Sequence, residues 1–387
     1  MDIDMEDDHQ SDEQDPHAHF FWQELAPVLV CYGITFIFGS VGNALIVYAT
    51  YRNGRMQSVT NVFLASLAIA DLLLIILCIP VKVAKLFSYT WDAGWLLCKG
   101  VHYVQNVSTL CSVFTLTAIS VERYYAIVHP MKARYICTIS QAQRVILITW
   151  CLSILLATPI LHVQIMQQVG EEHQDFYWCI RDWDSPYWRW HEIYMLLLVL
   201  IIPFCIMTLT YVAICWEVWN VMERRHIMTS SHALNRKECA IPLNEVNSQG
   251  TPIQQQSQGN SNCAGRRDDS KTVKQVIYML VVIVLVFAIC WTPLLVDNLL
   301  TAYGILSPVR GGWEKHMGTI FTLMAYFNSC INPVIYGFMS KNFRDSFRSV
   351  LCCFLPRQRD QRHMKPVTSS VRQISRTGSQ TRNTIVR

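Results

Sequence analysis

The residues most able to do chemistry in this chain are polar side chains inside long apolar stretches. Asp71 stands in the run from Leu67 to Leu72. An ionisable group at membrane depth costs several kcal/mol, so it is usually retained for function. Amide and hydroxyl groups fall at comparable depth in other stretches, at Asn43, Ser112, Asn328, Ser329 and Asn332. Together these side chains offer enough oxygen atoms for a small hard cation such as sodium. The alternative is a carboxylate that only hydrogen-bonds to its polar neighbours.

A carboxylate stands beside a guanidinium at the end of the third apolar stretch, in Glu122-Arg123-Tyr124. Such a pair at a helix end can form or break when neighbouring helices move apart. Further along, Pro293 and Pro333 interrupt two apolar stretches. Proline removes a helix hydrogen bond and so creates a kink that can act as a hinge. These residues predict a conformational switch, and the alternative is an ordinary ion pair at a helix end.

Signatures of catalysis are absent from the sequence. It has no His-Glu-x-x-His zinc motif, no Gly-x-Ser-x-Gly nucleophile elbow and no phosphate-binding loop. The hydrophobic fraction is 52% and the charged fraction only 16%, which is too apolar for a soluble protein. We therefore expect a membrane protein that is not an enzyme, that has no cofactor apart from a cation held by the buried oxygen atoms, and that has no nucleic-acid partner.

The apolar stretches have the length of membrane-spanning helices, which need about 20 residues. Seven such stretches occur, at residues 25–50, 59–87, 96–128, 143–163, 193–219, 273–302 and 316–338. Because backbone amides in lipid must be satisfied within the protein, these stretches predict an all-α membrane protein, a seven-transmembrane helix bundle over residues 25–338. Residues 339–353 follow as a short amphipathic eighth helix that lies on lipid.

The distribution of Lys and Arg predicts the orientation of the bundle. The basic residues in the loops after spans one, three and five are Arg52, Arg55, Lys132, Arg134, Arg224, Arg225, Arg236, Lys237, Arg266, Arg267 and Lys271. The acidic tail 1–24 has none, so we expect it to be extracellular, in a multi-pass protein of the plasma membrane. No signal peptide is recognisable, so the first span is expected to direct insertion. We expect the Gln-, Asn- and Ser-rich third inner loop, about 223–270, to be disordered, and residues 354–387 to form a cytoplasmic tail.

The order of motifs along the chain closely resembles the rhodopsin-like (class A) family of G-protein-coupled receptors. The resemblance covers roughly residues 25–353 and includes one hallmark in each span. These hallmarks are Gly42-Asn43, Asp71, Glu122-Arg123-Tyr124, Trp150, Pro203 with Tyr211, Phe287 to Pro293, and Asn332-Pro333 with Tyr336. A transporter or channel is the rival, but the buried polar residues form one cluster rather than a continuous polar path.

The resemblance implies a role for each of these motifs. Arg123 would turn inward on activation and meet Tyr211, Tyr336 and a heterotrimeric G protein, into which Met131 would pack. Phe287 and Trp291 would form a toggle beneath the ligand. The remaining implied sites are the sodium site at Asp71, Ser112, Asn328 and Asn332, and palmitoylation at Cys352 and Cys353.

Cys98 and Cys179 are the two cysteines that this orientation places on the oxidising side of the membrane. We therefore expect them to form a disulfide that holds the second outer loop over the mouth of the bundle. In the family this long loop, about 162–191, often folds as a hairpin.

The class of ligand follows partly from residues that are missing. No Lys stands in the seventh span, where Tyr326 takes its place, so a covalent retinal is excluded. Gln105 replaces the Asp of amine receptors, and with Asn106 it resembles the peptide-binding branch. Residues 127–138 resemble thyrotropin-releasing and ecdysis-triggering hormone receptors. The expected ligand-binding residues are Gln105, Asn106, Glu192, Asp297, Asn298, Thr322 and Tyr326.

The charge of the outer surface suggests the charge of the ligand. Acidic residues fill the tail and recur at Glu171, Glu172, Asp175, Asp182, Asp184, Glu192 and Asp297. A negative vestibule attracts a cationic peptide, so we expect a cationic neuropeptide or peptide hormone as ligand. The alternatives are an acidic tail that only solubilises the surface, and a receptor of the same family with a non-peptide ligand.

The basic carboxyl-terminal tail is rich in Ser and Thr between residues 368 and 384. Phosphorylation there would replace positive by negative charge and create a site for a basic partner. We therefore expect receptor kinases and arrestin as partners, besides the G protein and membrane lipid. A plain unstructured tail is the alternative.

Overall fold

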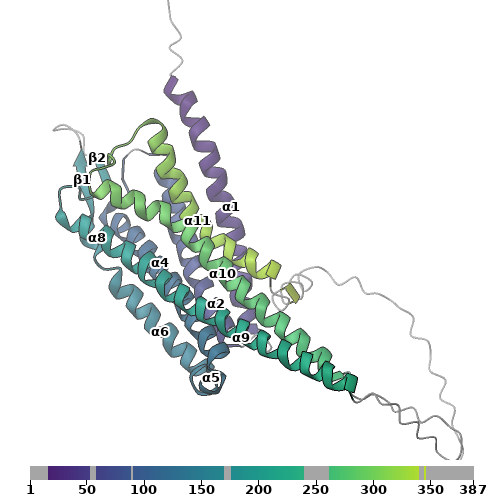
Figure 1. Cartoon of the computed structure of the whole chain (residues 1–387). Helices are drawn as coiled ribbons and strands as arrows, with labels where there is room; N and C mark the ends of the chain where they lie inside the picture. Colours follow the sequence, from purple (N-terminus) through teal and green to yellow (C-terminus); the bar gives the residue numbers. More distant parts are fainter. Residues whose placement is uncertain are drawn as a thin grey trace, which may run out of the picture.

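The chain folds into a bundle of long helices with a two-stranded hairpin at one end (Figure 1). The computed structural model describes residues 16–52, 58–88, 90–169, 176–238, 261–339 and 344–345. Most of the acidic tail, Arg55, Cys352, Cys353 and the hydroxyl-rich tail lie outside these ranges. We call the end of the bundle that carries the hairpin the disulfide end, and the opposite end, which carries Arg123, the arginine end.

Each predicted span corresponds to one helix or to consecutive helical pieces. Two spans contain a short π-helical turn, named η2 and η3, between α-helical pieces. The helices are α1 Pro16–Arg52, α2 Val59–Leu73 continued by η2 Leu74–Cys78 and α3 Ile79–Leu86, α4 Gly94–Val128, α5 Pro130–Ile136, α6 Ile139–Leu156 with α7 Ile160–Val163, α8 Pro186–Leu196 continued by η3 Leu197–Ile201 and α9 Ile202–Glu238, α10 Ser261–Ala302, and α11 Gly312–Met339. The predicted all-α bundle is confirmed.

Six of the described helical segments are both long and apolar enough to cross a membrane. The seventh span, α11, has 28 residues and is long enough at about 1.5 Å per residue. Its polar residues, among them Asn328, Ser329 and Asn332, lower its hydropathy. All three side chains are buried, with at most 4% exposure, and α11 packs between α1 and α10. Their polarity therefore faces the protein rather than lipid.

The hairpin at the disulfide end consists of β1 Gln164–Val169 and β2 Phe176–Arg181, paired antiparallel with Met166 opposite Cys179. A disulfide joins Cys179 to Cys98 in the first turns of α4. Trp91 packs against this disulfide, and its backbone N–H donates to the carbonyl of Tyr177 at 2.7 Å. The predicted disulfide and the predicted hairpin are both confirmed.

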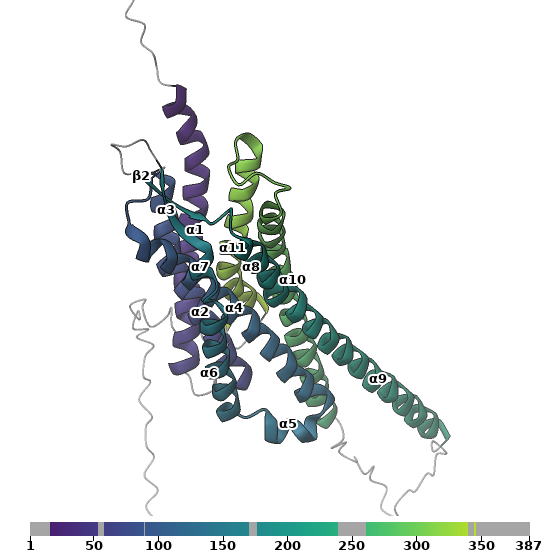
Figure 2. The same cartoon turned by 90° about the vertical axis from the view of Figure 1, so that its left-hand side faces the viewer.

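The helices at the arginine end are longer than the sequence predicts. α9 continues to Glu238 and α10 begins at Ser261, so the loop expected to be disordered over 223–270 is helical at both of its ends. Figures 1 and 2 show α9 running on past the other helices. Helix-favouring Met, Glu, Arg, Lys, Ala and Leu are common in residues 221–238, which explains the difference. Residues 239–260 and most of the expected eighth helix lie outside the described ranges.

α1 and α11 approach each other closely at Gly42 and Pro333. A Cβ atom added at Gly42 would lie 2.6 Å from Cβ of Pro333. Since the proline ring is rigid, a larger residue at Gly42 would push the two helices apart. Glycine is therefore required at this position.

We expect Gly42→Ala to destabilise the bundle by roughly 1–3 kcal/mol, the usual cost of overpacking. Thermal unfolding of the purified protein in detergent measures the effect. Gly33→Ala is the matched control on the same helix, because an added Cβ there has no neighbour within 4 Å. The control should be neutral or slightly stabilising, since Ala favours helix more than Gly. Equal unfolding temperatures for the two variants would contradict the close approach.

Candidate functional site

The polar residues singled out in the sequence are buried together inside the bundle. The side chain of Asp71 is 1% exposed and accepts a hydrogen bond from Nδ2 of Asn332 at 2.9 Å, which joins α2 to α11. No basic side chain of the described residues forms an ion pair with this carboxylate. Ser112 on α4 and Asn328 on α11 are buried as well, at 4% exposure each. The core therefore contains a carboxylate among neutral oxygen-bearing groups.

Neighbouring hydrogen bonds hold this polar cluster in position. Nδ2 of Asn43 donates to the carbonyls of Gly39 at 2.9 Å and Ser329 at 2.8 Å, and so links α1 to α11. One residue before Asp71, the carbonyl of Ala70 accepts a hydrogen bond from the hydroxyl of Ser108 at 2.7 Å. The cluster thus connects α1, α2, α4 and α11.

At the arginine end, Arg123 points to its neighbour Glu122. The guanidinium forms a two-pronged ion pair with the carboxylate. Glu122 is buried at 9% exposure and accepts a second hydrogen bond from the hydroxyl of Thr60 at 3.3 Å, at the start of α2. The Arg123 guanidinium is therefore kept beside Glu122 on its own helix, and the hydroxyl of Thr60 fixes the position of the Glu122 carboxylate.

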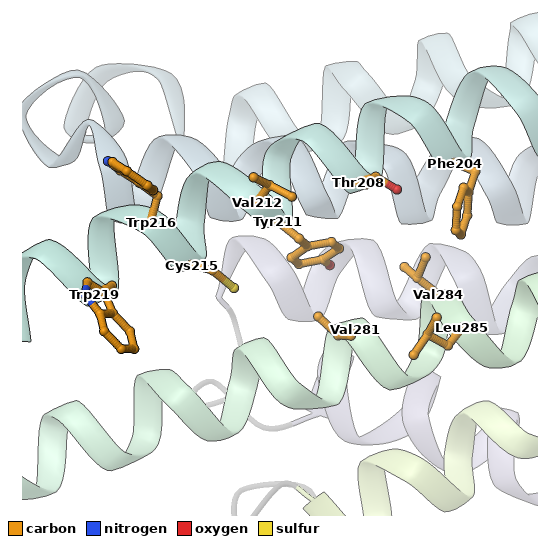
Figure 3. Close-up of a pocket in the computed structure, with 10 residues that line it drawn as sticks. All are labelled: Phe204, Thr208, Tyr211, Val212, Cys215, Trp216, Trp219, Val281, Val284 and Leu285. Atoms are coloured by element: carbon orange, nitrogen blue, oxygen red, sulfur yellow. The ribbon is translucent and has the colours of Figure 1, made fainter.

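Tyr211 on α9 does not contact Arg123 in this arrangement; its hydroxyl accepts a hydrogen bond from Ser120 on α4 at 3.1 Å. It lines a cavity of about 680 Å³ between α9 and α10, together with Thr208 and Val284. Figure 3 shows the ring of Tyr211 extending from α9 between the two helices. The interface between α9 and α10 is thus incompletely filled beside the predicted partner of Arg123.

The other residues assigned to the switch lie as follows. Tyr336 is buried at 1% exposure, and the hydroxyl of Tyr124 lies 3.3 Å from Nε2 of His129. Met131, expected to pack into a G protein, is 73% exposed on α5 at the arginine end. Its exposed side chain is available to a partner.

The predicted toggle lies in α10. The rings of Phe287 and Trp291 are stacked, with centroids 6.0 Å apart, and both side chains are buried. Pro293, which lies inside the same helix, follows two residues later. A movement of the Trp291 ring would therefore act on α10 next to the proline that interrupts its hydrogen bonds.

A second cavity, of about 590 Å³, opens at the disulfide end. Three of the predicted ligand-binding residues line it: Asp297, Asn298 and Thr322. The strand β2 contributes Cys179 and Arg181 to the same wall. These three residues, on α10 and α11, therefore lie together at one cavity, and their binding of a ligand stays a prediction.

The other four predicted ligand-binding residues bond to one another or to neighbouring helices instead of lining this cavity. The hydroxyl of Tyr326 donates to Oε1 of Gln105 at 3.1 Å. Nδ2 of Asn106 lies 3.5 Å from Nε2 of His191, whose Nδ1 lies 3.3 Å from Oε1 of Glu192. Both groups connect α4 to a facing helix, α11 or α8.

Several basic residues of the cavity were not expected from the sequence. They are Lys82, Lys85, His102, Arg181, Arg310 and Lys315. The two lysines lie inside the second predicted span, where a charged residue is itself a signal of function. The expected negative vestibule rested partly on Glu192 and Asp297, but both carboxylates form ion pairs, with Arg181 and with Arg310.

Comparison with known proteins agrees with this arrangement. The sequence pattern described as 7 transmembrane receptor (rhodopsin family) matches residues 42–336. The chain belongs to the rhodopsin family of seven-transmembrane receptors. The receptor is therefore a multi-pass membrane protein of the G-protein-coupled class, whose members are receptors rather than enzymes.

Curated relatives match most of the receptor. The QRFP-like peptide receptor of Branchiostoma floridae is 31% identical over 85% of this chain and 80% of the relative. The human cholecystokinin receptor type A is 32% identical over 86% of this chain and 82% of the relative. The pyroglutamylated RF-amide peptide receptor of Rattus norvegicus is 27% identical over 87% of this chain and 72% of the relative.

We expect Thr60→Val to raise the basal signalling of the receptor. The substitution removes the hydroxyl that donates to Glu122 while it keeps the shape of the side chain. A hydrogen bond to a charged group contributes about 1.5–3 kcal/mol, so the release of Arg123 should become about tenfold more frequent. Basal second-messenger levels at matched surface expression measure this.

Thr35→Val is the control for this variant, because the Thr35 hydroxyl donates to Cys31 of its own helix. It should leave basal signalling unchanged. Equal basal signalling in the Thr60 variant and the wild type would show that Thr60 does not restrain the Glu122–Arg123 pair.

Proposed function

We propose that the receptor binds an extracellular neuropeptide or peptide hormone at the disulfide end and activates a heterotrimeric G protein at the arginine end. The observation that carries the proposal is the cavity of about 590 Å³, which the hairpin borders and polar and charged side chains line. A wide polar cavity suits a peptide better than a small apolar molecule. Relatives whose names denote peptide receptors match over most of their length, which supports the same ligand class.

The orientation of the proposal rests on two independent features. A structural disulfide is typical of the oxidising side of a membrane, and Cys98–Cys179 lies at one end of the bundle. The basic residues of the loops lie toward the other end, where the positive-inside rule places the cytoplasm. The amino terminus is then extracellular and the arginine end cytoplasmic, in a receptor of the plasma membrane.

Signalling would proceed by a shift between two arrangements of the bundle. In the structure Arg123 is bound to Glu122, and we assign this pair to the closed arrangement. A peptide that prefers the open arrangement would shift the population, by at most its difference in affinity for the two states. Pro293 and Pro333 supply the hinges. In the open arrangement Arg123 would leave Glu122 and meet Tyr211, Tyr336 and the G protein.

The remaining partners follow from segments at the arginine end. Exposed Met131 would pack against the G protein. Receptor kinases and arrestin would act on the hydroxyl-rich tail, and palmitates on Cys352 and Cys353 would anchor the segment after α11 to lipid. The resemblance to hormone-receptor subfamilies and the cationic character of the ligand stay predictions.

The polar core fits a sodium ion, which we propose as an allosteric ligand of the receptor. Asp71 is buried without a basic partner among the described residues, and an unpaired buried charge is costly. Oδ1 of Asn43 is also buried without a hydrogen-bond partner there. The oxygens of Asp71, Ser112 and Asn328, with Asn332 beside them, would hold the ion. Bound sodium would supply charge neutralisation and favour the closed bundle.

A peptide screen tests the proposed ligand class. Cells that express the receptor with a promiscuous calcium-coupling G protein are exposed to a library of neuropeptides that includes amidated and basic members. We expect a calcium rise at nanomolar peptide. Arg123→Ala should abolish it at retained surface expression, because the guanidinium binds the G protein. Silence across peptides with a response to a lipid or an amine would refute the peptide class.

Sodium should lower agonist affinity in the wild type because it favours the closed bundle. Asp71→Asn removes the charge that attracts the ion, and we expect the sodium effect to disappear. Agonist competition binding in sodium chloride and in equimolar choline chloride measures the difference. An undiminished sodium effect in the variant would place the ion elsewhere. Asp182→Asn, on the loop after β2, serves as the control and should keep the effect.

A further inference from the structure

The charged residues around the cavity at the disulfide end are mostly basic. Five bases and one acid line it: Lys82, Lys85, Arg181, Arg310, Lys315 and Asp297. His102 also lines the wall. Whether this excess attracts an anion depends on how many of the bases are already paired within the receptor. The ion pairs of the described residues answer that question.

Three of the five bases are neutralised by carboxylates. Nη1 of Arg310 lies 2.7 Å from Oδ1 of Asp297, and both side chains are largely buried. Nη1 of Arg181 lies 3.0 Å from Oε1 of Glu192, which is 2% exposed and also contacts His191. Nζ of Lys315 lies 2.9 Å from Oε2 of Glu24. Each of these three bases therefore has a carboxylate partner supplied by the receptor itself.

Lys82 and Lys85 have no such partner among the described residues. No carboxylate of the described chain lies within ion-pair distance of either ammonium group. Nζ of Lys85 donates to the carbonyl of Cys179 at 3.2 Å, and that bond leaves its charge uncompensated. The two lysines are three residues apart on α3, and therefore lie on one face of that helix.

The surroundings concentrate this positive charge. Lys82 and Lys85 share the wall of one cavity with Arg181, so their positive charges add in the same space. Lys82 lies on α3, at the end of a membrane span, and its side chain is half-buried. Lys85 beside it is exposed. The half-buried charge of Lys82 next to a like charge is retained only where something offsets its desolvation and the repulsion between the two. An oxyanion between the two lysines would do so.

We propose that Lys82 and Lys85 form a subsite for an anionic group of the peptide ligand, a carboxylate or a sulfate. The subsite deepens the proposed function and rests on it. The anion would lie against α3 and β2, next to the disulfide, where the remaining N–H bonds of both ammonium groups can donate to its oxygens. Arg181 and Arg310, held by their own carboxylates, would shape the wall without binding this group.

The first test needs no ligand. Thr322→Cys places a thiol in the cavity wall, and its reaction rates with an anionic and a cationic methanethiosulfonate are measured on the purified receptor by mass spectrometry. We expect the anionic reagent to be favoured by about tenfold or more, relative to the same reagents on a free thiol in solution. A preference for the cationic reagent, or none, would overturn the proposal.

The lysines are then changed in this background. Lys82→Met with Lys85→Met should abolish the anion preference, while Lys82→Arg, which keeps the charge, should retain it. Lys99→Met is the matched control, because Lys99 at the same end donates to a backbone carbonyl, of Leu161 at 2.8 Å, but does not line this cavity. A loss of preference in the control equal to that of the double variant would refute the assignment to the two lysines.

The acidic residues 1–15 are a second source of the same chemistry. If the anion preference appears only after these residues are deleted, the receptor's own tail fills the subsite and the assignment to a ligand is overturned. A preference that is present in the full chain and unchanged by the deletion supports the ligand assignment.

The second test uses amidated peptides in matched pairs, one with Asp or Glu and the other with Asn or Gln at the same position. In the calcium assay we expect the acidic member of an active pair to be about tenfold or more potent. The two members should become equally potent on the Lys82→Met, Lys85→Met receptor. Equal potency on the wild type would overturn the subsite. Silence of every pair would count against the peptide function alone, because the thiol rates still decide the subsite.

Discussion

The structure depends on the rule that a polar group inside the bilayer must find its partner within the protein. No water is present at membrane depth to replace a missing hydrogen bond. Several buried amides and hydroxyls of this receptor therefore bond across helices: Asn332 to Asp71, Asn43 to the carbonyl of Ser329, and Ser108 to the carbonyl of Ala70. These three bonds hold α1, α2, α4 and α11 in one register. They also bring the groups of the proposed sodium site together, so cohesion and function rest on the same residues.

The two ends of the bundle are restrained in different ways. At the disulfide end a covalent bond joins β2 to α4, and the ion pair of Arg310 with Asp297 holds the loop before α11 to α10. At the arginine end Arg123 is held by one carboxylate, and a cavity of about 680 Å³ separates parts of α9 and α10. Non-covalent bonds of this kind exchange on the timescale of receptor switching, whereas a disulfide does not. We therefore place the moving part of the receptor at the arginine end.

The sequence predicted those features that depend on local composition or on pairing by elimination. Apolar length located every span, the orientation of the bundle predicted the pairing of Cys98 with Cys179, and the family resemblance predicted the hairpin. Features that arise from packing could not be predicted. The π-helical turns η2 and η3 are of this kind, as are the extensions of α9 and α10 beyond the membrane. The bonds from Glu192 to Arg181 on β2 and from Gln105 to Tyr326 on α11 also depend on how the elements pack.

The charge that a ligand meets in the cavity depends on which acidic and basic residues are paired with each other. The number of acidic residues on the outer side does not predict it. Acidic residues dominate the amino-terminal tail, and their field acts over about a Debye length, roughly 8–10 Å in physiological salt. Contact with a ligand depends instead on the charges that remain unpaired at hydrogen-bond distance. Three bases of the cavity wall are each bound to a carboxylate, of Asp297, Glu192 or Glu24. Lys82 and Lys85 have no carboxylate partner among the described residues. A peptide with a positive net charge and one acidic side chain would satisfy both conditions. The field of the tail would steer it toward the receptor, and its acidic group would then fix its orientation against α3.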